Sequence, residues 1–116
     1  MSVSLLIDYP NGDSPYQDNG RLLPISTEEN FYKYWYPVIE QEGYPWLSTV
    51  SIDFEPDNLL EVLNELRQLQ AAFPRYYKPD YEKYEYITSH LAELITVLEA
   101  VNPDDLASGK LELFLA

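Results

Sequence analysis

The chain has 116 residues, of which seven are Lys or Arg and twenty are Asp or Glu, so its formal net charge is −13. The length fits one domain over residues 1–116, and 46% hydrophobic residues with 15% aromatic residues argue against disorder. The negative charge disfavours nucleic acid and anionic membranes as partners, and the absence of cysteine excludes disulfides and thiolate metal sites.

The first predicted elements are strands. Residues 3–7 are nearly all apolar, which predicts a central strand. Asn11-Gly12 is a favourable tight-turn pair, so a hairpin forms if residues 22–25 supply a short return strand. The oxygen-bearing side chains between residues 8 and 20 do not have the spacing of a calcium loop, so no metal site is predicted there.

A helix is predicted to follow. Ser26 and Glu29 stand in the register of a capping box, which marks the start of this helix. Pro37 removes one backbone hydrogen bond, so we expect a kink or a break into two short helices. Gly43 is expected to end the element. The predicted inward residues are Phe31, Trp35, Val38 and Ile39.

The segment from residue 47 to residue 73 combines a strand and a helix. Val50, Ile52 and Phe54 alternate with polar residues, which predicts a strand with one buried face. Such a strand belongs to a sheet that helices cover on one side only. Asp57 or Asn58 is expected to cap the helix that follows.

That helix is strongly amphipathic. Its apolar stripe is predicted to comprise Leu59, Val62, Leu63, Leu66, Leu69 and Phe73. Asp57, Glu61 and Glu65 lie four residues apart and are expected to face outward on the opposite side. Two interpretations remain open for these acids: a solvated face of an acidic protein, or a surface that binds a basic partner.

Residues 74–81 are predicted to link two helices. This neighbourhood is rich in basic and aromatic side chains, unlike the rest of the chain. The candidate contact residues here are Tyr76, Tyr77 and Tyr81, because tyrosine can bind a partner through both its apolar ring and its hydroxyl. The alternative is a loop whose rings pack against the neighbouring helix ends.

A third helix is predicted from near Tyr81 to Asn102-Pro103, followed by a loop and a last strand over residues 110–115. Its inward stripe is predicted to comprise Tyr84, Ile87, Leu91, Leu94, Ile95, Leu98 and Val101, with His90 at the flank. The pattern predicts a two-layer α+β fold. Its sheet has three or four strands, with three helices packed mainly on one face.

The sequence contains no recognised catalytic signature. Four scattered glycines cannot build a phosphate-binding loop, and no serine has the local signature of a nucleophile. We therefore predict no cofactor and no enzymatic activity. A basic leader and an apolar run of about 20 residues are both missing, so a cytoplasmic protein without a membrane partner is expected.

One pattern lies between positions 31 and 69 and consists of Trp35-Tyr36-Pro37, Gly43, Trp46-Leu47, Leu59-Leu60 and Glu65-Leu66. This pattern resembles the small acidic immunity proteins of bacterial polymorphic toxin systems. The resemblance implies a protein that binds a toxin domain and covers its active site. It implies no catalytic residues.

Two functional hypotheses follow from charge, composition and this resemblance. The first is an inhibitor or immunity-type protein that neutralises a basic partner such as a toxin nuclease domain, with charge steering the encounter. The second is a general protein-interaction or structural module whose charge only maintains solubility. Both predict a protein partner, and only the first predicts inhibition.

Overall fold

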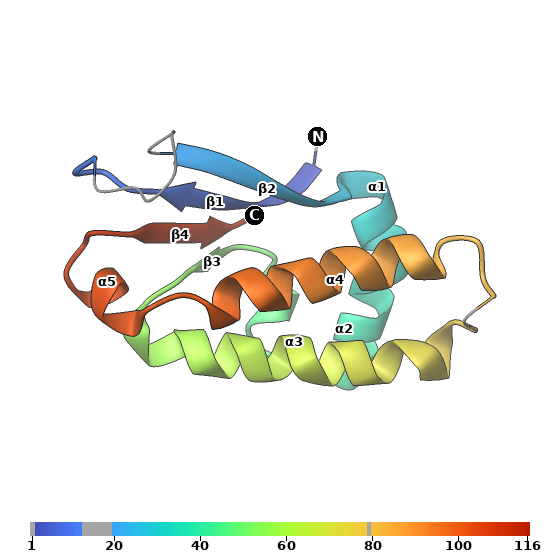
Figure 1. The fold of residues 1–116 in the computed structure, drawn as a ribbon. Helices are drawn as coiled ribbons and strands as arrows, with labels where there is room; N and C mark the ends of the chain where they lie inside the picture. The colour runs from blue at the N-terminus through green and yellow to red at the C-terminus, as the bar shows by residue number, and fades with distance from the viewer. Residues whose placement is uncertain (1, 13–19, 79) are drawn as a thin grey trace.

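The computed structural model describes residues 2–12, 20–78 and 80–116. Four antiparallel strands form one sheet in the order β2-β1-β4-β3, with helices packed below it in Figure 1. The strands are β1 (Ser2–Asp8), β2 (Gly20–Thr27), β3 (Ile52–Asp53) and β4 (Glu112–Leu115). The predicted two-layer α+β fold, with helices mainly on one face of the sheet, is confirmed.

The described helical segments all lie between β2 and β4 in the chain. They are α1 (Glu28–Asn30), the π-helical turn η1 (Phe31–Trp35), α2 (Tyr36–Glu42), the 3₁₀ turn η2 (Leu47–Thr49), α3 (Pro56–Tyr76), α4 (Tyr84–Glu99) and α5 (Pro103–Ala107). The long helices α3 and α4 lie side by side beneath the sheet (Figure 1). No helix in the described ranges is both long and apolar enough to cross a membrane.

The strand β1 is central, as predicted, because it pairs with β2 on one side and β4 on the other. The predicted hairpin is confirmed, although the return strand is longer than residues 22–25. Residues 13–19 of the connection lie outside the described residues. The pairing of β1 and β2 shifts register between Val3 and Ser4, and Pro24 lies within the edge strand β2.

The helical segment after β2 is interrupted next to Pro37, where the sequence predicts a kink or a break. The interruption is the π-helical turn η1, in which the Tyr36 N–H donates to the carbonyl of Phe31, five residues earlier. The predicted inward residues of this helix are all buried. The predicted cap was wrong by one residue: Thr27 Oγ1 accepts from the Asn30 N–H at 3.1 Å, while Ser26 is buried in β2.

The strand predicted around residues 50–54 is shorter than expected. Val50 has a φ of +58°, in the left-handed region, and it ends the 3₁₀ turn η2 instead of extending a strand. Ile52 and Phe54 are buried as predicted, but Val50 is only half-buried. The alternation of apolar residues identified the buried face without revealing the turn that precedes it.

The predicted cap of helix α3 was wrong: Glu55 is the N-cap, and Asn58, one of the two predicted candidates, lies at the third helical position and completes a capping box. Its Oδ1 accepts from the Glu55 N–H and its Nδ2 donates to the Asp53 carbonyl, both at 2.8 Å. The predicted end of this helix was wrong, because α3 continues through Pro74 to Tyr76. The predicted apolar stripe is buried throughout, so α3 packs with that side toward the core.

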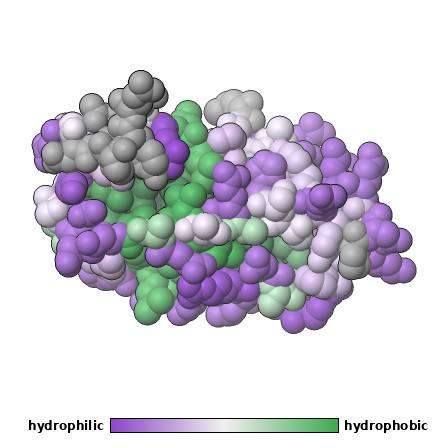
Figure 2. All heavy atoms as spheres, in the orientation of Figure 1, coloured by the Kyte–Doolittle hydropathy of each residue, from purple (hydrophilic) through white to green (hydrophobic). Residues whose placement is uncertain are grey.

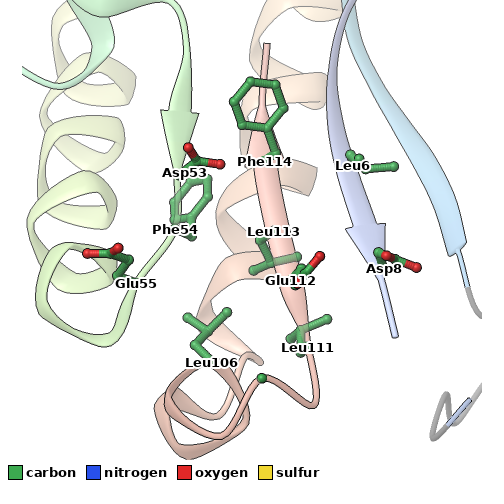
Figure 3. Close-up of a pocket in the computed structure, with 11 residues that line it drawn as sticks. Leu6, Asp8, Asp53, Phe54, Glu55, Leu106, Leu111, Glu112, Leu113 and Phe114 are labelled. Carbon is green, nitrogen blue, oxygen red and sulfur yellow. The ribbon is translucent and has the colours of Figure 1, made fainter. Parts of the chain in front are cut away.

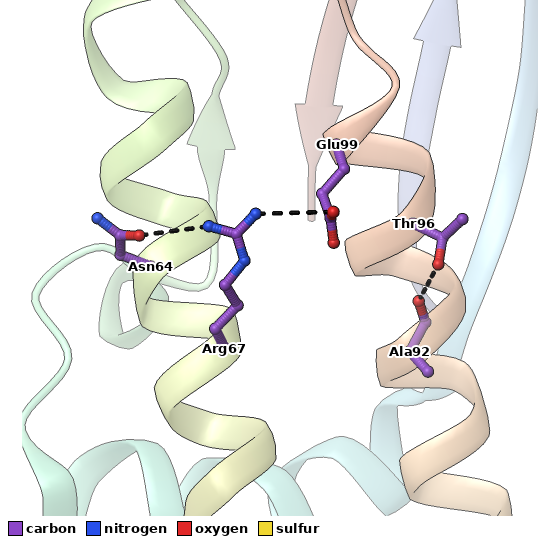
Figure 4. Close-up of polar contacts among 5 residues, drawn as sticks. All are labelled: Asn64, Arg67, Ala92, Thr96 and Glu99. Atoms are coloured by element: carbon purple, nitrogen blue, oxygen red, sulfur yellow. Dashed lines mark hydrogen bonds and ion pairs between the residues drawn. The ribbon is translucent and has the colours of Figure 1, made fainter.

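Helix α4 starts at Tyr84, three residues later than predicted, and buries the central part of its predicted stripe. Figure 4 shows α3 and α4 joined at their surface by an ion pair of 3.8 Å between Arg67 and Glu99. The predicted loop after α4 contains a short helix, α5. Asn102 caps this helix by accepting from the Asp104 N–H at 3.0 Å.

Candidate functional site

The acidic row predicted on α3 is not a uniform exposed surface. Asp57 and Glu61 are exposed, whereas Glu65 is buried with 7% of its surface exposed. One carboxylate oxygen of Glu65 accepts from the backbone N–H groups of Trp46 and Leu47, each at 3.0 Å. The prediction that Glu65 faces outward was therefore wrong.

The cause is a turn that packs against α3. Each four-residue step along a helix advances by about 40°, so a row of acids drifts around the helix toward its neighbours. At Glu65 the row meets the segment around η2. Glu61 also contacts this segment, since its Oε2 accepts from Trp46 Nε1 at 2.8 Å. Two of the three predicted partner-binding acids thus hold a turn of their own chain.

The tyrosines around the end of α3 pack against the first helices. The Tyr77 hydroxyl donates to the carbonyl of Tyr34 at 2.8 Å, and the Tyr77 ring stacks on Tyr81 with 5.6 Å between centroids. Burial raises the pKa of Tyr77. The alternative interpretation, in which the rings pack on neighbouring helix ends, therefore describes Tyr77.

Tyr76 and Tyr81 retain more exposed surface, 39% and 40% respectively. The Tyr76 hydroxyl donates to Glu42 Oε1 at 3.1 Å, and Arg75 binds the same oxygen at 2.6 Å. The hydrogen bond from Arg75 is the main reason that the pKa of Glu42 lies below its ordinary value. These contacts tie the end of α3 to the end of α2.

A third surface, which the sequence analysis did not identify, lies on the sheet face turned away from α3 and α4. One register row crosses the four strands there: Leu22 pairs with Leu6, Leu6 with Phe114, and Phe114 with Asp53. Leu22 and Leu6 are 65% and 41% exposed. The open sheet face thus carries an apolar row that ends at a carboxylate.

Acids occupy the neighbouring register row. Asp8 on β1 stands opposite Glu112 on β4 and opposite Gly20 on β2. A hollow of about 590 Å³ brings the two rows together. Figure 3 shows its lining from β1, β4 and the end of β3, with Leu106 of α5 at one end. The hollow is lined on this face by Leu6, Asp8, Asp53, Glu112 and Phe114.

The electrostatics of this hollow are one-sided. Its lining contains the carboxyl residues Asp8, Asp53, Glu55 and Glu112 and no Lys, Arg or His. Within residues 2–12, 20–78 and 80–116, the side chains of Asp8, Asp53 and Glu112 make no ion pair or hydrogen bond. The arrangement can therefore accept hydrogen bonds from a cationic group that enters from outside.

The described part of the chain contains no cluster of three or more His, Cys, Asp or Glu side chains arranged to hold a metal ion. The lone histidine, His90, lies away from the hollow on α4. Its Nδ1 is 2.8 Å from the Tyr86 carbonyl, and its ring lies 4.3 Å from the Tyr86 ring. His90 thus has local partners at the helix surface.

Figure 2 shows one side of the molecule, on which apolar residues form a band from the strands down to α3 and hydrophilic residues cover much of the remaining surface. The three predicted or observed surfaces therefore differ in kind: an acidic helix row partly bound by its own chain, a packed tyrosine cluster, and an open apolar and acidic sheet face. No protein family, curated protein or solved structure matches the chain.

Proposed function

We propose that this chain is an acidic protein-binding domain whose partner presents a basic surface. The open sheet face is the observation that carries this proposal, because exposed leucines lie there beside carboxylates with no described cationic partner. Apolar contacts supply affinity at protein interfaces, and complementary charge speeds the encounter and selects the partner. Seven cationic side chains cannot neutralise twenty carboxylates, so most of the charge is directed at solvent or partners.

We further propose an inhibitory role of the immunity type, in which binding blocks a toxin domain such as a nuclease. The resemblance of residues 31–69 to immunity proteins supports this narrower role. Nucleases carry basic surfaces because they bind phosphate backbones, and an acidic inhibitor complements such a surface. The proposal assigns the chain no catalytic step, no cofactor and no metal, and places it in the cytoplasm.

The test starts from the intact chain immobilised in a lysate of its source, at low salt, with elution at high salt. The eluted protein is then purified and its affinity for the chain is measured over a range of salt concentrations. We expect a partner with excess Lys and Arg and an affinity that falls as salt rises. An affinity independent of salt contradicts the charge argument.

The inhibitory role has a separate readout. If the partner is a toxin domain, an equimolar amount of the chain should abolish its activity in the purified system and restore growth of cells that express it. A partner that binds normally and keeps its full activity would instead support the alternative function, a general interaction module without an inhibitory role.

A further inference from the structure

We propose that the partner docks on the open sheet face through a basic amphipathic polypeptide segment. Apolar side chains of this segment would cover Leu6, Leu22 and Phe114, and a Lys or Arg would lie between Asp8 and Glu112. This inference rests on the proposed function, since it names the surface and the chemistry by which the basic partner is bound.

Strand register forms the apolar part of this docking surface. Leu22, Leu6 and Phe114 occupy one row on three adjacent strands, β2, β1 and β4. Adjacent strands are about 4.8 Å apart, so the row extends roughly 10 Å across the sheet. A row of that length accommodates a few apolar side chains of an extended segment. Leu22 is the most exposed member, which makes it the one with the most surface to bury.

The next register row supplies the charged part of this docking surface. Asp8 and Glu112 stand directly opposite each other on β1 and β4. Like charges at directly opposite positions destabilise a sheet, and an ammonium or guanidinium group between them removes this repulsion. At Gly20, the third residue of the row, an added Cβ would lie 3.4 Å from Asp8 Oδ1. Glycine at this position leaves that side of the carboxylate uncovered.

The same charges argue against other occupants. Asp53 extends the apolar row and Glu55 lines the same hollow, so carboxylates flank the apolar row at one end and along its side. A second copy of this chain would bring a surface of the same sign into contact, and anionic lipid would be repelled. A basic segment meets no such repulsion.

The rival surface on α3 is less available. Glu65 is buried against Trp46 and Leu47, and Glu61 binds the Trp46 indole. A partner on that side would compete with contacts that hold the chain's own turn. On the open sheet face, the carboxylates of Asp8 and Glu112 have no such contacts in the part of the chain that the structure describes.

The experiment uses the full chain and three synthetic peptides as probes: one alternating lysine with leucine, one alternating lysine with serine, and one alternating glutamate with leucine. Affinities are measured by calorimetry at low salt, and binding sites are mapped by amide chemical shifts in NMR. We expect the lysine–leucine peptide to bind most tightly, with the largest shifts in residues 4–8 and 112–115. The glutamate–leucine peptide should not bind.

Two charge-matched variants locate the site. Asp8→Asn with Glu112→Gln should weaken binding of the lysine–leucine peptide about fivefold, as expected for the loss of two exposed ion pairs. Asp57→Asn with Glu61→Gln removes the same charge from α3 and should change the affinity by less than about twofold. Leu22→Ser should also weaken binding. This variant should fold, because Leu22 is highly exposed and its substitution leaves the core intact.

The outcomes separate the two proposals. Failure of both lysine peptides to bind the unmodified chain would contradict the proposed function itself. Equal loss of affinity in the two charge variants, or shifts confined to α3, would overturn the docking site and leave the proposed function standing. Concentration-dependent self-association that Leu22→Ser abolishes would overturn it too, since the occupant would then be a second copy of the chain.

Discussion

The two faces of the sheet differ although they are built from the same strands. Leu5 and Leu6 are neighbours on β1, yet their side chains lie on opposite faces of the sheet. Leu5 is fully buried on the face that the helices cover, and Leu6 is 41% exposed on the open sheet face. On the covered side, side chains of α3 and α4 fill the space against the strands. On the open sheet face, residues of equal hydrophobicity remain in contact with solvent, and this exposure is the property that the proposed docking requires.

The polar groups of the two sides differ in the same way. On the helical side, the Glu65 carboxylate and the Tyr77 hydroxyl bind backbone groups of their own chain. On the open sheet face, Asp8 and Glu112 stand opposite each other without an internal partner in the described residues. The exposed acids of this protein therefore have to be identified from packing, because their spacing in the sequence does not distinguish them from buried acids.

The largest expected change in stability is a difference between substitutions of the two leucines of β1. Leu5→Ala should lower the free energy of unfolding by about 2–5 kcal/mol, because it removes buried methyl groups and leaves a cavity. Leu6→Ala should lower it by less than about 1 kcal/mol. Urea unfolding followed by circular dichroism measures both. Similar losses in the two variants would show that the two faces are equally packed.

A smaller difference in stability is expected between substitutions of two glutamates of α3. Glu65→Ala leaves the N–H groups of Trp46 and Leu47 without their acceptor, so we expect a loss of about 1–3 kcal/mol in the free energy of unfolding. Glu61→Ala removes one exposed hydrogen bond and should cost less than about 1 kcal/mol. Thermal unfolding of both variants is the measurement, and a stable Glu65→Ala variant would contradict a structural role for this carboxylate.

The next prediction tests whether the Tyr77 hydroxyl stabilises the helical side of the molecule. Tyr77→Phe removes the hydrogen bond to the Tyr34 carbonyl and keeps the ring, so the free energy of unfolding should fall by about 1 kcal/mol. Tyr32→Phe is the control, since Tyr32 is 48% exposed and should tolerate the change. Equal unfolding midpoints for the two variants would mean that the Tyr77 hydroxyl contributes nothing to stability.

The smallest expected change is a gain in stability instead of a loss. Asp8→Asn removes the repulsion with Glu112, so it should raise the free energy of unfolding by roughly 0.2–0.5 kcal/mol at low salt. The gain should shrink at high salt because exposed charges are then screened. Asp57→Asn on α3 provides the control for a general reduction of negative charge. A larger gain in the control would leave the Asp8–Glu112 pair without a special role.

Local patterns predicted most of the fold. The apolar run of β1 and the stripes of α3 and α4 identified these three elements and about half of the buried apolar residues, because burial imposes a period on each element. The errors lie in short features that show no apolar period. Val50 adopts a left-handed turn that alternation does not reveal, and α5 is too short to show a stripe.

The candidate site was mostly beyond local patterns. Glu65 has the spacing of an exposed acid, but its burial depends on a turn 18 residues away in the chain. The row of Leu22, Leu6 and Phe114 exists only because β2 and β4 pair with β1 in a particular register. The one local signal was the period-two alternation of each strand, which places Leu6 and Phe114 on the other face of the sheet from their buried neighbours in the chain.

Strand β2 also has a consequence for solubility at high concentration. Ser4 and Ala116 exchange backbone hydrogen bonds, so Pro24, which is opposite Ser4 on β2, turns its backbone toward the free edge of the sheet. Proline has no amide hydrogen, so a strand from another molecule would find a gap in the ladder there, next to an irregular register. The β2 edge, which lies beside the exposed leucines, is therefore a poor template for the addition of a further strand.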